Sequence, residues 1–197
     1  MELNPDATYD CLFMADRMQF GPGPFATAEL HLFAYLACLL WLYRGRAVSD
    51  WGYPFVGTEL GAPYSQAIDG AIDILVERGY FLKAGDRLRT TEAAANQLRV
   101  FSGLIMNQFR EECLIAACSS MTAFSAGMVC NALTQEPDLR RAANTPMSRQ
   151  LLEDAALSQL HLQFDALRDA LQEMDTDLRL PAVTWLTTLY RAREVSA

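Results

Sequence analysis

The sequence predicts a mainly α-helical protein in which a winged helix-turn-helix with a short β-hairpin wing is followed by an α-helical C-terminal half. Two helical patterns joined by a linker precede two short β-type runs. The dipeptide Gly85-Asp86 separates these runs, as expected for a two-residue hairpin turn. Beyond residue 100 the apolar residues recur at helical spacing. We therefore expect a leader over residues 1–26, a winged-helix domain over residues 27–100, and a helical extension over residues 101–197 that packs on it.

The leader and the first domain helix are separated by a strong helix breaker, Gly21-Pro22-Gly23-Pro24. The leader is expected to be irregular, with a short helix near residues 9–18. Thr27 is suited to cap the helix that follows, which extends to about Tyr43. The apolar residues of this helix share one broad face: Leu30, Phe33, Leu36, Ala37, Leu40 and Trp41.

The second helix of the domain is expected over residues 66–78. Between Trp51 and Tyr64, three glycines and two prolines leave room only for a short helix or turn. Ser65 is a good N-cap for the second helix, and Gly79 supplies the residue just beyond its end.

The hairpin comprises residues 80–84 and 87–90, and Thr91 then caps another helix. From Thr91 to about Leu133 the pattern predicts one long helix or two. Breaks are expected at Gly103 and at Ser119-Ser120.

The last third of the chain is expected to hold two more helices. Residues 134–147 are polar and predict a connector. Thr145 or Ser148 caps an amphipathic helix that extends to about Met174. Pro181 is well placed to open a final helix that ends near Arg193.

Composition excludes some partners and locations. Sixteen basic and 24 acidic residues leave a net charge of −8. This charge disfavours a protein whose whole surface binds nucleic-acid phosphates, and it disfavours an anionic membrane as the partner. Five cysteines, without a Cys-x-x-Cys motif, predict free thiols in a reducing cytoplasm. Residues 113–135 are uncharged and long enough to span a bilayer, but their small and polar side chains predict a buried helix instead.

No set of residues has the spacing of a catalytic or metal site. His31 and His161 are far apart, and neither belongs to a zinc-ligand pattern. The sequence contains no Gly-x-Ser-x-Gly elbow and no phosphate-binding loop. We therefore expect a protein that is not an enzyme and that holds no cofactor or metal.

The second helix of the predicted domain carries three acidic residues, Asp69, Asp73 and Glu77, spaced four apart on one side. In a DNA-reading helix-turn-helix this helix enters the major groove, where carboxylates would be repelled by phosphates. These residues form either a solvated helix face or a surface that docks on a basic partner protein. The second interpretation is our functional hypothesis.

The predicted hairpin has the opposite sign, because it carries Lys83, Arg87 and Arg89. Such a hairpin makes a secondary contact with a nucleic-acid backbone, binds an acidic protein surface, or simply protects its own edge with charge. Residues 27–90 hold six basic and seven acidic residues, a net charge of −1. The charges of this segment are therefore nearly balanced, and they are sorted between helix and hairpin.

The run from Ile68 to Gly79, continued by Tyr80-Phe81-Leu82 and Arg87-Leu88-Arg89-Thr90-Thr91-Glu92, resembles a pattern common to many bacterial winged-helix proteins. The order of elements over residues 27–100 also resembles the small middle component of bacterial ABC-three-component defence systems, of which Lamassu is an example. This resemblance implies a non-enzymatic assembly subunit between an SMC-like ATPase and a separate effector, acting against phage or plasmids. It implies no catalytic residues.

The alternative is a dimeric winged-helix transcription regulator that binds duplex DNA. Its contacts would involve Lys83, Arg87 and Arg89, and the helices predicted over residues 148–174 or 181–193 would form the dimer. The acidic residues on the second helix favour the interaction subunit over this alternative.

Overall fold

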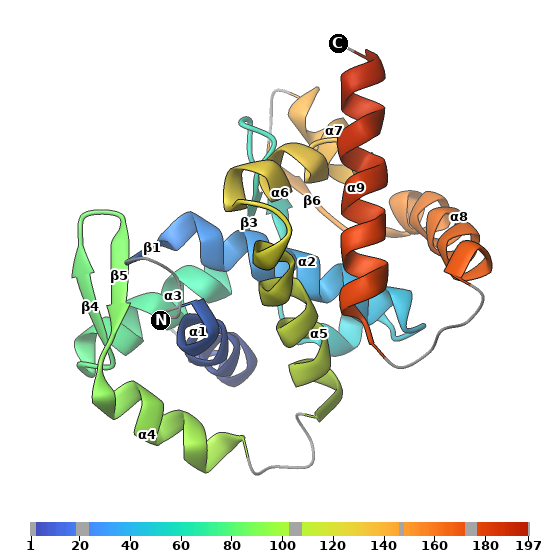
Figure 1. Ribbon diagram of the computed structural model, residues 1–197. Helices are drawn as coiled ribbons and strands as arrows, with labels where there is room; N and C mark the ends of the chain where they lie inside the picture. Colours follow the sequence, from blue (N-terminus) through green and yellow to red (C-terminus); the bar gives the residue numbers. More distant parts are fainter. Residues whose placement is uncertain (1–2, 19–23, 103–107, 146–147, 172–176, 197) are drawn as a thin grey trace.

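A computed structural model describes residues 3–18, 24–102, 108–145, 148–171 and 177–196. The fold is mainly α-helical, as predicted, with two small antiparallel sheets. In Figure 1 the hairpin and α4 (Glu92–Phe101) lie at one side of the molecule, and α8 (Asp154–Leu171) and α9 (Arg179–Ser196) lie at the other.

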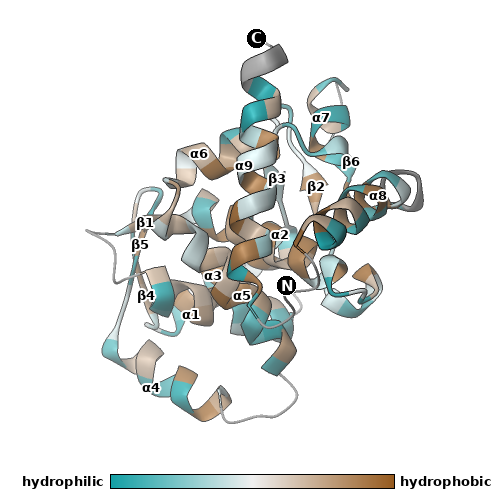
Figure 2. Ribbon diagram, turned by 45° about the vertical axis from the view of Figure 1, so that its right-hand side comes forward, coloured by the Kyte–Doolittle hydropathy of each residue, from teal (hydrophilic) through white to brown (hydrophobic). Residues whose placement is uncertain are grey.

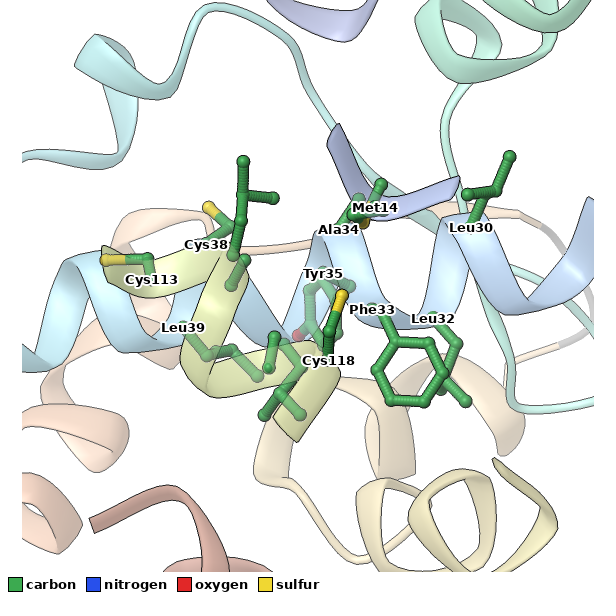
Figure 3. Packing of buried hydrophobic residues seen from close by; sticks show 14 of the residues in the cluster. Met14, Leu30, Leu32, Phe33, Ala34, Tyr35, Cys38, Leu39, Cys113 and Cys118 are labelled. Atoms are coloured by element: carbon green, nitrogen blue, oxygen red, sulfur yellow. The ribbon is translucent and has the colours of Figure 1, made fainter. Parts of the chain in front are cut away.

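Helix α2 (Thr27–Tyr43) forms the centre of the core. All side chains from Leu30 to Leu40 are buried, so the expected apolar face lies in the core and the residues outside that face are buried as well. The helix is buried all round because α1 (Pro5–Met18) and α5 (Gln108–Ser119) both pack on it. Figure 3 shows this packing from close by, and in Figure 2 the hydrophobic parts of the ribbon lie mainly in the interior.

The start of α2 is stabilised differently from our expectation. Ala26, not Thr27, is the residue that precedes the helix. The Glu29 carboxylate accepts a hydrogen bond from the Ala26 N–H at 2.8 Å, which satisfies a backbone donor that the helix leaves unpaired.

Helix α1 (Pro5–Met18) is longer than the short helix expected in the leader, and it is not peripheral. It packs against α2, α3 (Gln66–Glu77), α4 and α5, and small side chains such as Ala7, Cys11 and Ala15 are fully buried. Small residues allow this close approach between helices. Helix packing thus crosses residues 26 and 100, and the division of the chain at these residues stays a prediction.

Helix α3 (Gln66–Glu77) and the hairpin lie where the sequence analysis expects them, but the Ser65 hydroxyl makes no capping hydrogen bond to the helix. Ser65 precedes the helix, and Gly79 follows it with φ +72°, the left-handed conformation that glycine adopts without strain. Strands β4 (Phe81–Ala84) and β5 (Arg87–Thr90) form the hairpin, and β1 (Phe25–Ala26) pairs with β5. The sheet order is therefore β1-β5-β4.

Thr91 precedes α4 as predicted, but its hydroxyl does not cap that helix. The hydroxyl donates instead to the Gly79 carbonyl at 2.9 Å. Thr91 thereby joins the start of α4 to the end of α3.

The segment predicted as a polar connector contains a helix, α7 (Pro137–Ala143), one side of which is buried. The Glu136 carboxylate caps it, accepting hydrogen bonds from the N–H groups of Asp138 at 3.0 Å and Leu139 at 2.8 Å. Both Glu136 and Asp138 are fully buried, so their polarity was a misleading guide to exposure. The second sheet lies beside α7 and consists of β2 (Val56–Gly57), β3 (Pro63–Tyr64) and β6 (Arg149–Gln150). Its strand order is β3-β2-β6.

The remaining breaks fall close to their expected places. Helix α5 ends at Ser119 and a short 3-10 turn, η3 (Ser120–Thr122), leads to α6 (Ala126–Leu133). Helix α8 begins at Asp154, later than expected, because β6 occupies the residues before it. Gly103 and Met174 lie outside the described residues.

No single helix in the described parts of the chain is long and apolar enough to cross a membrane. The segments 108–122 and 126–133 reach the necessary length and composition only together, and they are bent by 113° where they meet.

Glu136 makes the stability of the fold depend on pH. Burial raises the pKa of Glu136 to about 7, from 4.5. Between these values the folded state binds more protons than the unfolded state, so the free energy of unfolding falls as pH rises. We expect this group to contribute a loss of up to about 3 kcal/mol between pH ~4.5 and ~7.

Urea unfolding across this pH range measures the effect. In Glu136→Gln the decline attributable to this carboxylate should disappear, whereas Glu59→Gln, at an exposed turn, should unfold like the wild type. His31 has the opposite effect on the pH dependence of stability. Burial lowers the pKa of His31, so the folded state binds fewer protons there than the unfolded state, and the free energy of unfolding falls as pH decreases. Because Glu136→Gln leaves His31 unchanged, the comparison of this variant with the wild type isolates the contribution of Glu136. Identical pH profiles of the free energy of unfolding for the two proteins would exclude that contribution.

Candidate functional site

The acidic stripe, defined as Asp69, Asp73 and Glu77, is exposed along one side of α3. On the opposite side Ile68, Ile72 and Leu75 are buried in the core. The structure therefore brings the three carboxylates onto one exposed face, with the orientation that their spacing predicts.

Asp69 is held in place by two neighbours. The Tyr64 hydroxyl donates to one of its carboxylate oxygens at 2.9 Å, and His31 Nε2 lies 3.3 Å from the other. The Ser65 N–H donates to His31 Nδ1 at 3.1 Å, so Nδ1 carries no proton and Nε2 is the donor to Asp69. Burial lowers the pKa of His31, while Asp69 opposes this shift.

His31 is thus a positioning residue that the sequence did not identify. It is buried, its ring stacks on Tyr64 with centroids 4.9 Å apart, and it connects α2 to the first turn of α3. No spacing motif signals this role, because the contact joins positions far apart in the chain.

The remaining two carboxylates are in different environments. Asp73 lies 3.9 Å from Lys83 Nζ on the hairpin. Within the described residues, Glu77 has no ion pair or hydrogen bond through its side chain. The outer end of the acidic stripe is therefore its most available part.

The three basic residues predicted on the hairpin, Lys83, Arg87 and Arg89, lie on two faces of the sheet. The register pairs Lys83 with Leu88, whose side chain is buried against the core. Because directly opposite residues share a face, Lys83 lies on the α3 side of the hairpin. Arg87 and Arg89 lie on the other side, so the three basic residues of the hairpin face two directions.

A buried ion pair joins α1 to α5 in the core. The Arg110 guanidinium on α5 donates to both carboxylate oxygens of Asp10 on α1, at 2.6 and 2.8 Å. Tyr53 donates a further hydrogen bond to Asp10, and the guanidinium lies 4.0 Å from the Trp51 ring centroid. Burial lowers the pKa of Arg110, but the Asp10 carboxylate outweighs this and raises it. The sequence did not single out these residues.

The surface of the described chain also contains pockets. A cleft of about 730 Å³ is lined by residues that include Tyr53, Gln150 and His161. A smaller cavity of about 300 Å³ lies between α1, α3 and α4, and Leu12, Leu75 and Phe101 are among its apolar walls.

Neither a metal centre nor an activated thiol is found in the described parts of the chain. No group of three or more His, Cys, Asp and Glu side chains there is placed to hold a metal ion. The five cysteines are free. Burial raises the pKa of Cys113 and Cys118 to about 12, so both are protonated at neutral pH and are poor nucleophiles.

The chain matches no protein-family model, no curated protein and no solved structure. The geometry of the site is therefore the basis for a functional assignment.

Proposed function

We propose that this protein is a non-enzymatic interaction subunit of a multi-protein complex, and that its acidic stripe docks on a basic surface of a partner. The proposal rests on the exposed acidic face of α3, where contacts with His31 and Tyr64 fix the position of Asp69. A surface with one sign of charge attracts a complementary partner and repels nucleic-acid phosphates.

We infer that α1, α2, α3 and the β4–β5 hairpin together form a winged helix. Their order along the chain supports this assignment. The pairing of β1 with β5 supports it further, because it anchors the hairpin beside the start of α2. In such a domain α3 occupies the place of the helix that other members insert into DNA. Here its outward face is suited to a protein instead.

The resemblance over residues 27–100 suggests which partners to test. We propose an SMC-like ATPase and a separate effector, in a system that acts against phage or plasmids. We also propose a cytoplasmic location, where the free cysteines remain reduced.

The test is co-purification with the products of the genes that flank its own. Asp73→Lys combined with Glu77→Lys should abolish co-purification of the basic partner, because attraction becomes repulsion. Asp69 is left unchanged because it also holds His31 and Tyr64 in place. The matched control is Asp165→Lys with Asp169→Lys, at exposed acidic positions on α8. Equal recovery of the partner with both double variants would refute the docking role.

The transcription regulator is retained as a second candidate because Arg87 and Arg89 are exposed on the hairpin. It predicts that the isolated protein binds a specific duplex and that salt weakens this binding. We expect no duplex binding at low ionic strength. Salt-sensitive binding to one sequence in a fluorescence titration would favour the regulator.

A further inference from the structure

A second surface lies on the side of the hairpin away from α3. We define the outer wing face as Ala26, Leu82, Ala84, Arg87 and Arg89. The register pairs Leu82 with Arg89, and it pairs Arg87 with both Ala84 and Ala26, so these side chains share one face of the sheet. The other face contains Phe81 and Leu88, which are buried in the core. Figure 1 shows the hairpin at the edge of the molecule.

The outer wing face is basic and only weakly compensated. Arg87 donates to the Pro24 carbonyl at 3.2 Å, which fixes its position without neutralising its charge. Among the described residues Arg89 has no carboxylate partner. Two carboxylates lie near this face: Asp86 in the turn, and Glu29, which accepts the hydrogen bond from the Ala26 N–H. Within the described residues neither forms an ion pair with Arg87 or Arg89, so both guanidinium groups stay available to a partner.

The same face is also partly apolar. The side chain of Leu82 is 60% exposed, which makes it one of the most exposed large hydrophobic residues in the described chain. Ala26 and Ala84 have short side chains, and they lie directly opposite Arg87. A partner can therefore approach the sheet closely between the arginines and contact Leu82.

These features together specify the chemistry of a partner. A nucleic-acid backbone would satisfy the arginines but would leave Leu82 without an apolar contact. An amphipathic helix with apolar residues on one stripe and carboxylates beside it satisfies both. We propose that the outer wing face binds an acidic amphipathic helix of a partner protein.

This proposal adds to the proposed function, but it concerns a different surface. If both are right, the acidic stripe binds a basic partner while the outer wing face binds an acidic one. The chain then joins two proteins of opposite charge. Lys83 is not part of the outer wing face, because it lies on the other side of the hairpin, 3.9 Å from Asp73 of the acidic stripe.

The test uses a fluorescent synthetic helix with leucines at i, i+3, i+4 and i+7 and glutamates beside them, titrated with the full-length protein at low ionic strength. We expect saturable binding that Arg89→Gln weakens about tenfold, since each charge-assisted hydrogen bond contributes strongly. Leu82→Ser should weaken binding about fivefold through the lost apolar contact. Lys83→Gln, the matched control on the opposite side of the hairpin, should bind like the wild type.

Three comparisons make the proposal falsifiable. A peptide with serine in place of leucine should bind more weakly, and one with lysine in place of glutamate should not bind. No binding of the glutamate–leucine helix, or unchanged binding by Arg89→Gln, would overturn the proposal. Tighter binding of a random DNA duplex than of this helix would also overturn it, in favour of nucleic acid. None of these results depends on Asp73 or Glu77, so the proposed function is tested separately.

Discussion

Replacement of Arg110 by methionine is expected to lower the free energy of unfolding by about 3–5 kcal/mol. Asp10 is fully buried, and Arg110 satisfies both of its oxygens. Without the guanidinium the carboxylate would remain in the core with only the Tyr53 hydroxyl as a described hydrogen-bond partner. Desolvation of an unpaired charge is the cause of the large effect.

Urea unfolding measures this change, and two further variants define its origin. Asp10→Leu combined with Arg110→Met should be less destabilised than Arg110→Met alone, because no buried charge is left. Asp165→Asn, which removes the exposed pair with Arg168, should cost less than about 1 kcal/mol. Acid should reduce the penalty of Arg110→Met, because Asp10 then becomes neutral. A double variant less stable than the single one would show that packing, not charge, dominates.

Phe33→Ala is expected to cost about 3–5 kcal/mol of the free energy of unfolding. Phe33 has no exposed surface and lies in the stretch of α2 that is buried all round. Removal of its ring loses apolar burial and leaves a cavity that rigid neighbouring helices fill only in part. Figure 3 shows Phe33 among the core side chains around Cys118.

The matched control is Phe109→Ala at the start of α5. Phe109 is 56% exposed, and the Arg46 guanidinium lies 4.7 Å from its ring centroid. This substitution should cost about 1 kcal/mol or less, because little buried surface is lost. Guanidinium unfolding of both variants gives the comparison. Equal destabilisation would mean that α2 is not the centre of the core.

The candidate site shows what local sequence patterns predict well. The four-residue spacing of Asp69, Asp73 and Glu77 correctly placed them opposite a buried face, because the helix period determines both. The same kind of reasoning would have separated Lys83 from Arg87 and Arg89. A two-residue turn pairs Lys83 with the apolar Leu88, which places it on the core side. Our prediction counted charges on the hairpin without applying this register.

Contacts between distant segments were beyond such patterns. His31 and Asp69 come from different helices, and Asp10 and Arg110 are separated by 100 positions. In the sequence, each of these residues looks like any polar residue within a helical pattern, and nothing near it indicates its partner. Glu136 and Asp138 are a similar case, since their segment was predicted as a polar connector and both residues are fully buried.

The sequence by itself therefore determined the mainly helical class, the hairpin and the exposed face of α3, because helix and strand periods depend on neighbouring residues. Only the tertiary structure decided that α2 is buried on every side, that α1 belongs to the core, and that the basic residues of the hairpin face two directions. Burial and charge pairing arise when distant segments pack together, and this packing is not encoded in any local period.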